Sequence, residues 1–186
     1  MEKIAFVGTA GTGKTTLIDH LRNDYADNER VVFVEEAARK FFNENKFDDD
    51  ERRNEDIQSR ILALILQLER AAHEQDPEII FCDRSVLDAV VYVLSEGDTE
   101  GAEAMYTELE AWVNTYTKIY VLDPEDVPHE TDEIRLEDAG IRQKVHEAYI
   151  RFLRSKDIQY EILSGTIEER ITIVKSAVSK NDIIEV

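Results

Sequence analysis

Residues 8–15 read Gly-Thr-Ala-Gly-Thr-Gly-Lys-Thr, and this stretch decides how the rest of the chain is interpreted. It matches the pattern G-x-x-x-x-G-K-[ST] at every fixed position, a pattern typical of phosphate-binding loops that join a strand to a helix. The apolar run at residues 4–7 predicts the strand, and residues 14–21 have the composition of the helix. The stretch therefore predicts a site for a nucleoside triphosphate.

The residue types of this loop explain why it would bind phosphate. Glycines let the backbone curl so that its N–H groups face one point, and the N-terminus of the next helix adds partial positive charge. Lys14 supplies a full charge for the β- and γ-phosphates, and the Thr15 hydroxyl is a ligand for Mg²⁺. The residues expected to contact the nucleotide are Gly8, Thr9, Ala10, Gly11, Thr12, Gly13, Lys14, Thr15 and Thr16.

Short apolar runs alternate with longer amphipathic segments along the chain. The runs that predict further strands lie at residues 31–34, 79–82, 119–122 and 160–163. Helices are expected at residues 37–42, 57–68, 85–94, 103–113, 141–153 and 167–178. This alternation is typical of a parallel sheet with helices on both faces. The sequence thus predicts an α/β fold with five parallel strands, as a single domain over residues 1–186.

Polar residues follow the second and third predicted strands, where parallel sheets bind ligands. Asp83 would help to organise Mg²⁺, and Arg84 would hold an acceptor phosphate or stabilise transferred charge. Glu36 could deprotonate or position an acceptor hydroxyl, and Arg39 shares a helix face with it. The alternatives are that Asp83 or Ser85 only caps a helix, and that Glu36 is an ordinary helix-terminal acid.

Residues 124–140 carry seven acids, one arginine and few apolar residues. We interpret them as a solvated flap, and residues 124–142 as a small lid over the site. Arg135 and Arg142 are candidates for cations that reach the phosphates when the site closes and water leaves. The alternative is that both are ordinary surface arginines.

The whole chain has 186 residues, with 41 acids against 22 bases, and its formal net charge is −19. Such a charge repels phosphate backbones and anionic lipids, so neither nucleic acid nor a membrane is an expected partner. No apolar run approaches the roughly 20 residues that span a bilayer. Cys82 is the one cysteine, which excludes an internal disulfide and makes a reducing cytoplasm the expected compartment.

With these residues in view, the chain resembles the P-loop kinase-like group of AAA-type ATPase-like domains, near thymidylate, deoxynucleoside and ribosylnicotinamide kinases. The resemblance covers nearly the whole chain. The segments that carry it are GTAGTGKTT at 8–16, EEAARKF at 35–41, the helix at 58–69, FCDRSVLDAVVY at 81–92, the arginines at 135 and 142, and GTIEERI at 165–171.

This resemblance implies ATP and Mg²⁺ as cofactors, with Thr15 and Asp83 as the metal ligands. The residues that it assigns to catalysis are Lys14, Glu36, Asp83, Arg84, Arg135 and Arg142. Those that it assigns to the acceptor are Glu36, Arg39 and Arg84.

The expected function is ATP- and Mg²⁺-dependent phosphoryl transfer to a small acceptor, such as a nucleotide, a nucleoside or nicotinamide riboside. Thymidylate kinases usually carry an Arg-Glu-Pro type segment where this chain has Glu-Glu-Ala at 35–37, and deoxynucleoside kinases usually have Glu where it has Asp83. The acceptor, and whether it already carries a phosphate, are therefore open. Related kinases are often dimers, but the sequence leaves the oligomeric state open.

The alternative function is a nucleotide-dependent ATPase switch that acts with a protein partner and transfers phosphate to water. It would use the same loop but would need no convergence of Glu36, Arg39 and Arg84 on a small pocket. A GTPase is not favoured, because no Asn/Thr-Lys-x-Asp motif follows a late strand.

Overall fold

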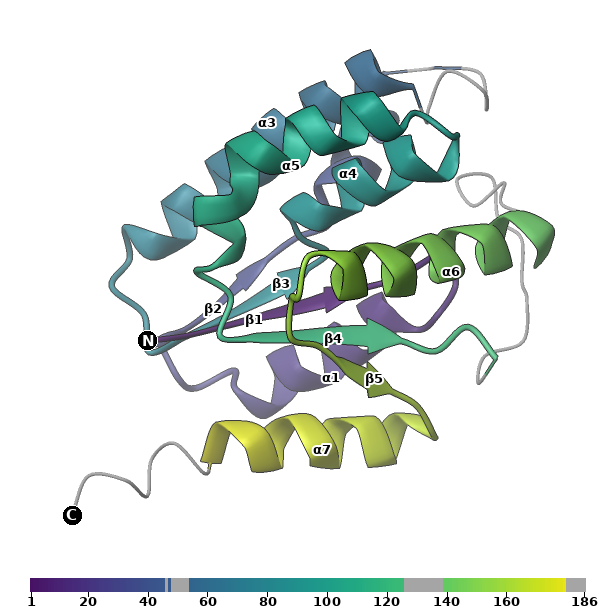
Figure 1. Ribbon diagram of the computed structural model, residues 1–186. Coiled ribbons are helices and arrows are strands. Elements are labelled where there is room, and N and C mark those ends of the chain that lie inside the picture. The colour runs from purple at the N-terminus through teal and green to yellow at the C-terminus, as the bar shows by residue number, and fades with distance from the viewer. Residues whose placement is uncertain (46, 48–53, 126–138, 180–186) are drawn as a thin grey trace.

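The computed structural model describes residues 1–45, 47, 54–125 and 139–179. Strands and helices alternate in these residues (Figure 1). In chain order they are β1 (Glu2–Val7), α1 (Lys14–Asp24), β2 (Val31–Val34), α2 (Ala37–Glu44), α3 (Glu55–His73), β3 (Ile79–Asp83), α4 (Val86–Ser95), α5 (Thr99–Val113), β4 (Lys118–Leu122), α6 (Ala139–Ser155), β5 (Glu161–Leu163) and α7 (Ile167–Ser179).

The five strands form one parallel sheet in the order β2-β3-β1-β4-β5. The predicted α/β class and the five parallel strands are therefore confirmed. β1 lies between β3 and β4, and Phe6 near the end of β1 pairs with Asp83 at the end of β3. This register brings the loop after β1 next to the polar residues that follow β3.

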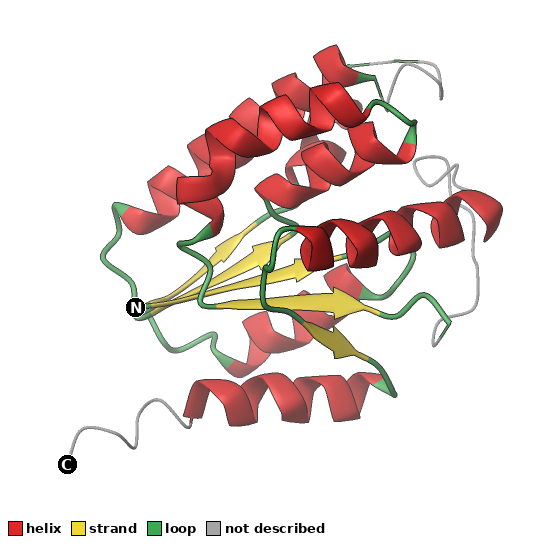
Figure 2. Cartoon of the chain, viewed as in Figure 1, coloured by secondary structure: helices red, strands yellow, loops and turns green. Residues whose placement is uncertain are grey.

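Side chains of the strands alternate between two apolar layers. Ala5 of β1 and Cys82 of β3 pack into the core beneath α3, α4, α5 and α6. Phe6 and Phe81 face the opposite side, where α1 and α7 cover the sheet (Figure 2). Helices on both faces are thus confirmed. Among the described residues, no helix is both long and apolar enough to cross a membrane.

Side-chain caps fix where several helices begin. Asn54 accepts a hydrogen bond from the Ile57 amide at the start of α3. Asp98 accepts one from Gly101, so α5 begins at Thr99, four residues earlier than predicted. The glycines in residues 96–101 indicate a loop, so the sequence alone does not identify Asp98 as a helix cap.

The predicted lid lies largely outside the described residues. Residues 126–138, which include Arg135, are not described. The lid, its boundaries and the role of Arg135 therefore stay predictions, as does the extent of a single domain.

Candidate active site

The loop after β1 has the backbone that the glycine pattern predicts. Gly13 has φ 84° and Gly8 has φ 130°, values that only glycine adopts readily. A side chain at Gly8 would also lie 3.2 Å from the carbonyl oxygen of Leu122. In the described part of the chain, α1, with Gly13 as its N-cap residue, has no side-chain cap, and neither has α2, whereas α3, α4 and α5 are capped. The first amides of α1 are thus left for a ligand.

Lys14 lies folded into the curl of the loop. Its ammonium donates to the carbonyl oxygens of Gly8 at 2.8 Å and Thr9 at 2.6 Å, and it lies 3.2 Å from Oγ1 of Thr12. Burial, and then the nearby Arg84 guanidinium, lower the pKa of Lys14 to about 8. The charge is therefore held at the centre of the loop, against oxygen atoms that a phosphate oxygen can replace.

Thr15 and Asp83 meet where the ends of β1 and β3 lie side by side. The Thr15 hydroxyl donates to Oδ2 of Asp83 at 3.2 Å. Asp83 is only 5% exposed, and its Oδ1 has no hydrogen-bond partner among the described residues. Burial, together with the charge of Glu36, raises the pKa of Asp83 to about 6. A buried, unsatisfied carboxylate oxygen beside a hydroxyl fits the oxygen ligands of Mg²⁺.

The rest of a metal shell would have to come from a bound nucleotide or from water. In the described ranges, no three His, Cys, Asp or Glu side chains gather as a metal cluster. Mg²⁺ sites of this kind use one or two protein ligands together with substrate phosphates. Thr15 and Asp83 beside the phosphate loop match that requirement.

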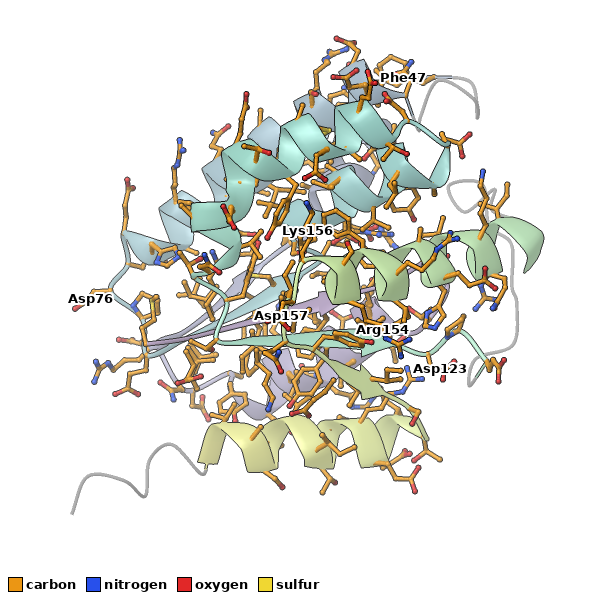
Figure 3. The ribbon with its side chains drawn as sticks, viewed as in Figure 1. Phe47, Asp76, Asp123, Arg154, Lys156 and Asp157 are labelled. Carbon is orange, nitrogen blue, oxygen red and sulfur yellow. The ribbon has the colours of Figure 1, made fainter. Side chains whose placement is uncertain are left out.

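Arg84 is the most constrained side chain of the site. It is 9% exposed and contacts Oε1 of Glu36 at 2.7 Å and Oδ1 of Asp88 at 2.9 Å. Its backbone has φ 79°, a left-handed conformation that costs free energy for a residue with a side chain. Among the described residues, the other non-glycine positions with positive φ are Asp76 and Asp157, in turns after α3 and α6 (Figure 3). Aspartate tolerates this conformation, so the strain at Arg84 stands out.

Ser85 shows that capping and site chemistry coexist in this turn. Its hydroxyl accepts a hydrogen bond from the Leu87 amide, and its own amide donates one to Oδ2 of Asp88, which forms a capping box at α4. Asp83 takes no part in that cap and instead contacts Thr15. The capping interpretation is therefore correct for Ser85, and Asp83 is left for another role.

Glu36 joins the two acceptor-side arginines. Its Oε1 accepts from Arg84, and its Oε2 accepts from Nε of Arg39 at 3.2 Å. Burial alone would raise the pKa of Glu36, but the charges of Arg84 and Lys14 prevail and lower it to about 2. The three-residue spacing predicts that Glu36 and Arg39 share a helix face; α2 begins at Ala37 with Glu36 as its N-cap residue, and the two side chains pair. Glu36 stays ionised at neutral pH.

A cavity of about 480 Å³ opens beside these groups. Its walls come from α1, from the segment that runs from the end of β2 through α2, and from the end of β3. The lining residues are Thr15, Ile18, Asp19, Arg22, Glu35, Glu36, Arg39, Lys40, Asn43, Glu44 and Asp83. The space therefore reaches the candidate metal ligands and two of the three candidate acceptor contacts, Glu36 and Arg39. Arg84 is not among the lining residues and reaches the cavity only through its pair with Glu36.

A family model described as an AAA domain matches residues 3–170, which is most of the chain. The chain belongs to this AAA domain family. A comparison with curated proteins finds no match.

Solved structures place this AAA domain among P-loop kinase-like folds. NadR protein in complex with NAD and AMP-PNP has a TM-score of 0.73 and 22% identity, and the match covers 100% of this chain and 50% of that one. The chain thus spans about half the length of NadR. Thymidylate kinase from Candida albicans has a TM-score of 0.66 and 14% identity, covering 97% and 92% of the two chains. Deoxyadenosine kinase from M. mycoides has a TM-score of 0.62 and 14% identity, and the match covers 96% of this chain and 99% of that one.

Two arginines of this AAA domain hold the phosphate loop through its carbonyl oxygens. Arg142, 6% exposed, donates to the carbonyl oxygens of Gly11 at 3.3 Å and Pro124 at 3.2 Å. Arg142 is therefore not an ordinary surface arginine. Arg170 of α7 donates to the Thr12 carbonyl at 2.7 Å.

Sequence reasoning missed Arg170 and Asp88 as parts of this site, although each left a signal. Arg170 lies four residues before the buried Val174 of α7 and is itself 2% exposed, so a cation occupies the apolar face of that helix. Asp88 completes the pattern Ser-x-x-Asp with Ser85, which is typical of a capping box. What the pattern does not show is that Asp88 also contacts Arg84.

Proposed function

We propose that this AAA domain is a kinase that uses ATP and Mg²⁺ to phosphorylate a hydroxyl of a small acceptor, namely a nucleotide, a nucleoside or nicotinamide riboside. One observation carries the proposal: a single cavity is lined both by Thr15 and Asp83 and by Glu36 and Arg39. A nucleotide switch needs the first pair, but it has no need for the second.

The structural neighbours support this range of acceptors. NadR protein has been solved in complex with NR, and deoxyadenosine kinase with products dCMP and dCDP. Their identities to this chain are 20% and 14%, so they establish the shared fold. The acceptor-side residues of this chain supply the rest of the argument.

The loop residues of this chain would bind and neutralise the triphosphate. The amides at the start of α1 and the Lys14 ammonium face the space enclosed by the loop. Thr15 and Asp83 would hold Mg²⁺, which supplies charge neutralisation between the β- and γ-phosphates. Arg142 lies over Gly11 and adds positive charge at the same place. Most of the rate would come from positioning and charge stabilisation.

Glu36 would orient the acceptor hydroxyl and would not act as a strong base. Its pKa of about 2 makes it a weak proton acceptor. Each of its oxygens accepts one arginine hydrogen bond and has a second lone pair for an acceptor hydroxyl. A loose phosphoryl-transfer transition state asks little of a base, so orientation by Glu36 is sufficient.

The test is ADP release from Mg-ATP across a panel of deoxynucleosides, nucleoside monophosphates, nicotinamide riboside and water alone. We expect one acceptor to stimulate release and to gain a phosphate by mass. Lys14→Ala should lower kcat/KM on the order of 10²–10³-fold. Lys144→Ala, on the exposed face of α6, is the matched control and should retain full activity. ADP release that needs Lys14 but that no acceptor stimulates would contradict the kinase and favour an ATPase switch.

A further inference from the structure

The cavity beside Asp83 has an unusual charge balance for a site that accepts phosphorylated molecules. Five carboxylates and three cations line it. The carboxylates belong to Asp19, Glu35, Glu36, Glu44 and Asp83, and the cations to Arg22, Arg39 and Lys40. When all are ionised, the lining carries two negative charges in excess. A triphosphate bound at the loop would add more negative charge next to it.

Two of the three cations that line this cavity lie against carboxylates, and the third, Lys40, is exposed. Arg39 is paired with Glu36, and Arg22 lies 3.9 Å from Asp19. Arg84 behind them is held between Glu36 and Asp88. A phosphate dianion that bound Arg39 or Arg84 would have to break these pairs, and the carboxylates left behind would then face it. Because Glu36 is tied to two arginines, its negative charge cannot easily be removed by protonation.

The same lining suits a molecule that presents hydroxyls. Exposed carboxylates accept hydrogen bonds from sugar hydroxyls, and the amide of Asn43 can both donate and accept. Asp83 contributes a carboxylate to this lining, and its buried Oδ1 has no hydrogen-bond partner among the described residues. Ile18 is the one aliphatic side chain in the lining.

We infer that the acceptor reaches this site without a phosphate, as a neutral or cationic molecule with a hydroxylated sugar, and that the site disfavours the corresponding monophosphate. This inference rests on the proposed kinase function and narrows it. Neutral nucleosides and the cationic nicotinamide riboside share this chemistry. The product would carry the γ-phosphoryl group of ATP on a sugar oxygen, with ADP as leaving group and the hydroxyl proton released.

The experiment compares matched pairs of acceptors with Mg-ATP: each nucleoside against its own 5′-monophosphate, and nicotinamide riboside against its mononucleotide. We expect at least a tenfold higher kcat/KM for the unphosphorylated member of the productive pair. A preference for the monophosphate would overturn this inference and leave the kinase intact. If neither member of any pair is phosphorylated, the proposed function fails, and this inference fails with it.

A double variant tests whether charge is the cause. Glu35→Gln with Glu44→Gln removes two carboxylates from the lining, so the preference within a pair should fall at least threefold, through a lower KM for the monophosphate. The matched control, Glu108→Gln with Glu110→Gln, removes two exposed carboxylates from α5 and should leave the preference unchanged. An unchanged preference in the cavity variant would overturn the charge argument.

Discussion

Two clusters of buried charge lie at opposite ends of the same sheet, and they differ in how completely they are satisfied. At the amino end, Lys3 of β1 and Glu69 of α3 are both fully buried and 2.6 Å apart. The Lys3 ammonium also donates to Thr115 and lies over the rings of Trp112 and Tyr116. Glu69 accepts from the Trp112 indole at 2.7 Å and the Tyr116 hydroxyl at 2.6 Å.

The cluster at the carboxyl end contains as much charge but leaves some of it unmatched. Asp83 has an oxygen without a hydrogen-bond partner among the described residues, Arg84 has a strained backbone, and a cavity opens beside both. In the amino-end cluster, by contrast, Lys3 and Glu69 are fully hydrogen-bonded to each other and to their neighbours, and we call this the saturated cluster. Among the described residues, it has no free polar group for a ligand, and its role is to hold β1, α3 and α5 together. Unmet polar groups and perturbed pKa values beside a cavity indicate a place where a ligand completes the interactions.

The largest expected effect concerns the stability of the saturated cluster. Glu69→Ala leaves the Lys3 ammonium buried without its carboxylate, so the free energy of unfolding should fall by about 3–5 kcal/mol in a urea titration. Glu161→Ala, which breaks the exposed pair with Lys118, should cost less than about 1 kcal/mol. Equal losses for the two variants would show that the amino-end cluster does not stabilise the fold in this way.

At the carboxyl end, substitution should affect activity and spare stability. Asp83→Asn removes a candidate metal ligand, so kcat should fall by an amount that corresponds to a loss of about 3 kcal/mol in transition-state stabilisation. High Mg²⁺ should restore part of kcat. The free energy of unfolding without nucleotide should not fall. Asp98→Asn is the control, because asparagine caps α5 as well as aspartate does. Wild-type kcat in the Asp83 variant at all Mg²⁺ concentrations would remove Asp83 from the site.

The contribution of Glu36 to the free energy of unfolding should depend on pH, because its carboxylate is paired with Arg84. Its pKa is depressed from 4.5 to about 2, so it stabilises the folded state above pH 4.5 and loses that contribution as the pH falls toward 2. The difference in unfolding free energy between wild type and Glu36→Gln should thus reach about 2–3 kcal/mol at pH 7 and shrink below pH 4.5. Urea titrations at several pH values measure it. A difference that is independent of pH would contradict the pairing with Arg84.

The smallest effect expected is at the link between the clusters. The Tyr116 hydroxyl donates to Glu69 and accepts from the amide of Val86, the first residue of α4. Tyr116→Phe leaves both groups without that partner and should cost about 1–2 kcal/mol in unfolding free energy. Tyr160→Phe, which loses only an exposed contact with Arg154, should change it by less than about 0.5 kcal/mol. A larger loss at Tyr160 than at Tyr116 would contradict this role.

Much of the fold could be predicted because its signals are local. The glycine loop lies between β1 and α1 as expected, and each apolar run became a strand of the parallel sheet. The meeting of Thr15 and Asp83 was also predictable, since parallel strands end at one edge. The roles assigned to these residues stay predictions until activity is measured.

The pairings between distant buried charges could not be predicted. Glu69 continues the four-residue spacing of Ile61 and Ile65 on the buried face of α3, but nothing local identifies Lys3 as its partner. In the same way, the sequence shows Arg84 and Glu36 as neighbours of strands, yet not that Arg84 would also engage Asp88. Such contacts depend on how helices pack across the sheet, which periodicity does not encode.

The most direct test of the central claim separates the acceptor side from the nucleotide side in one variant. Arg39→Ala should lower acceptor-stimulated ADP release at least tenfold while the Kd for Mg-ATP stays within twofold of wild type. Arg151→Ala, on the exposed face of α6, should change neither. Unaltered stimulation in Arg39→Ala, or ADP release that proceeds equally without any acceptor, would contradict the assignment of this edge of the sheet to phosphoryl transfer between ATP and a small molecule.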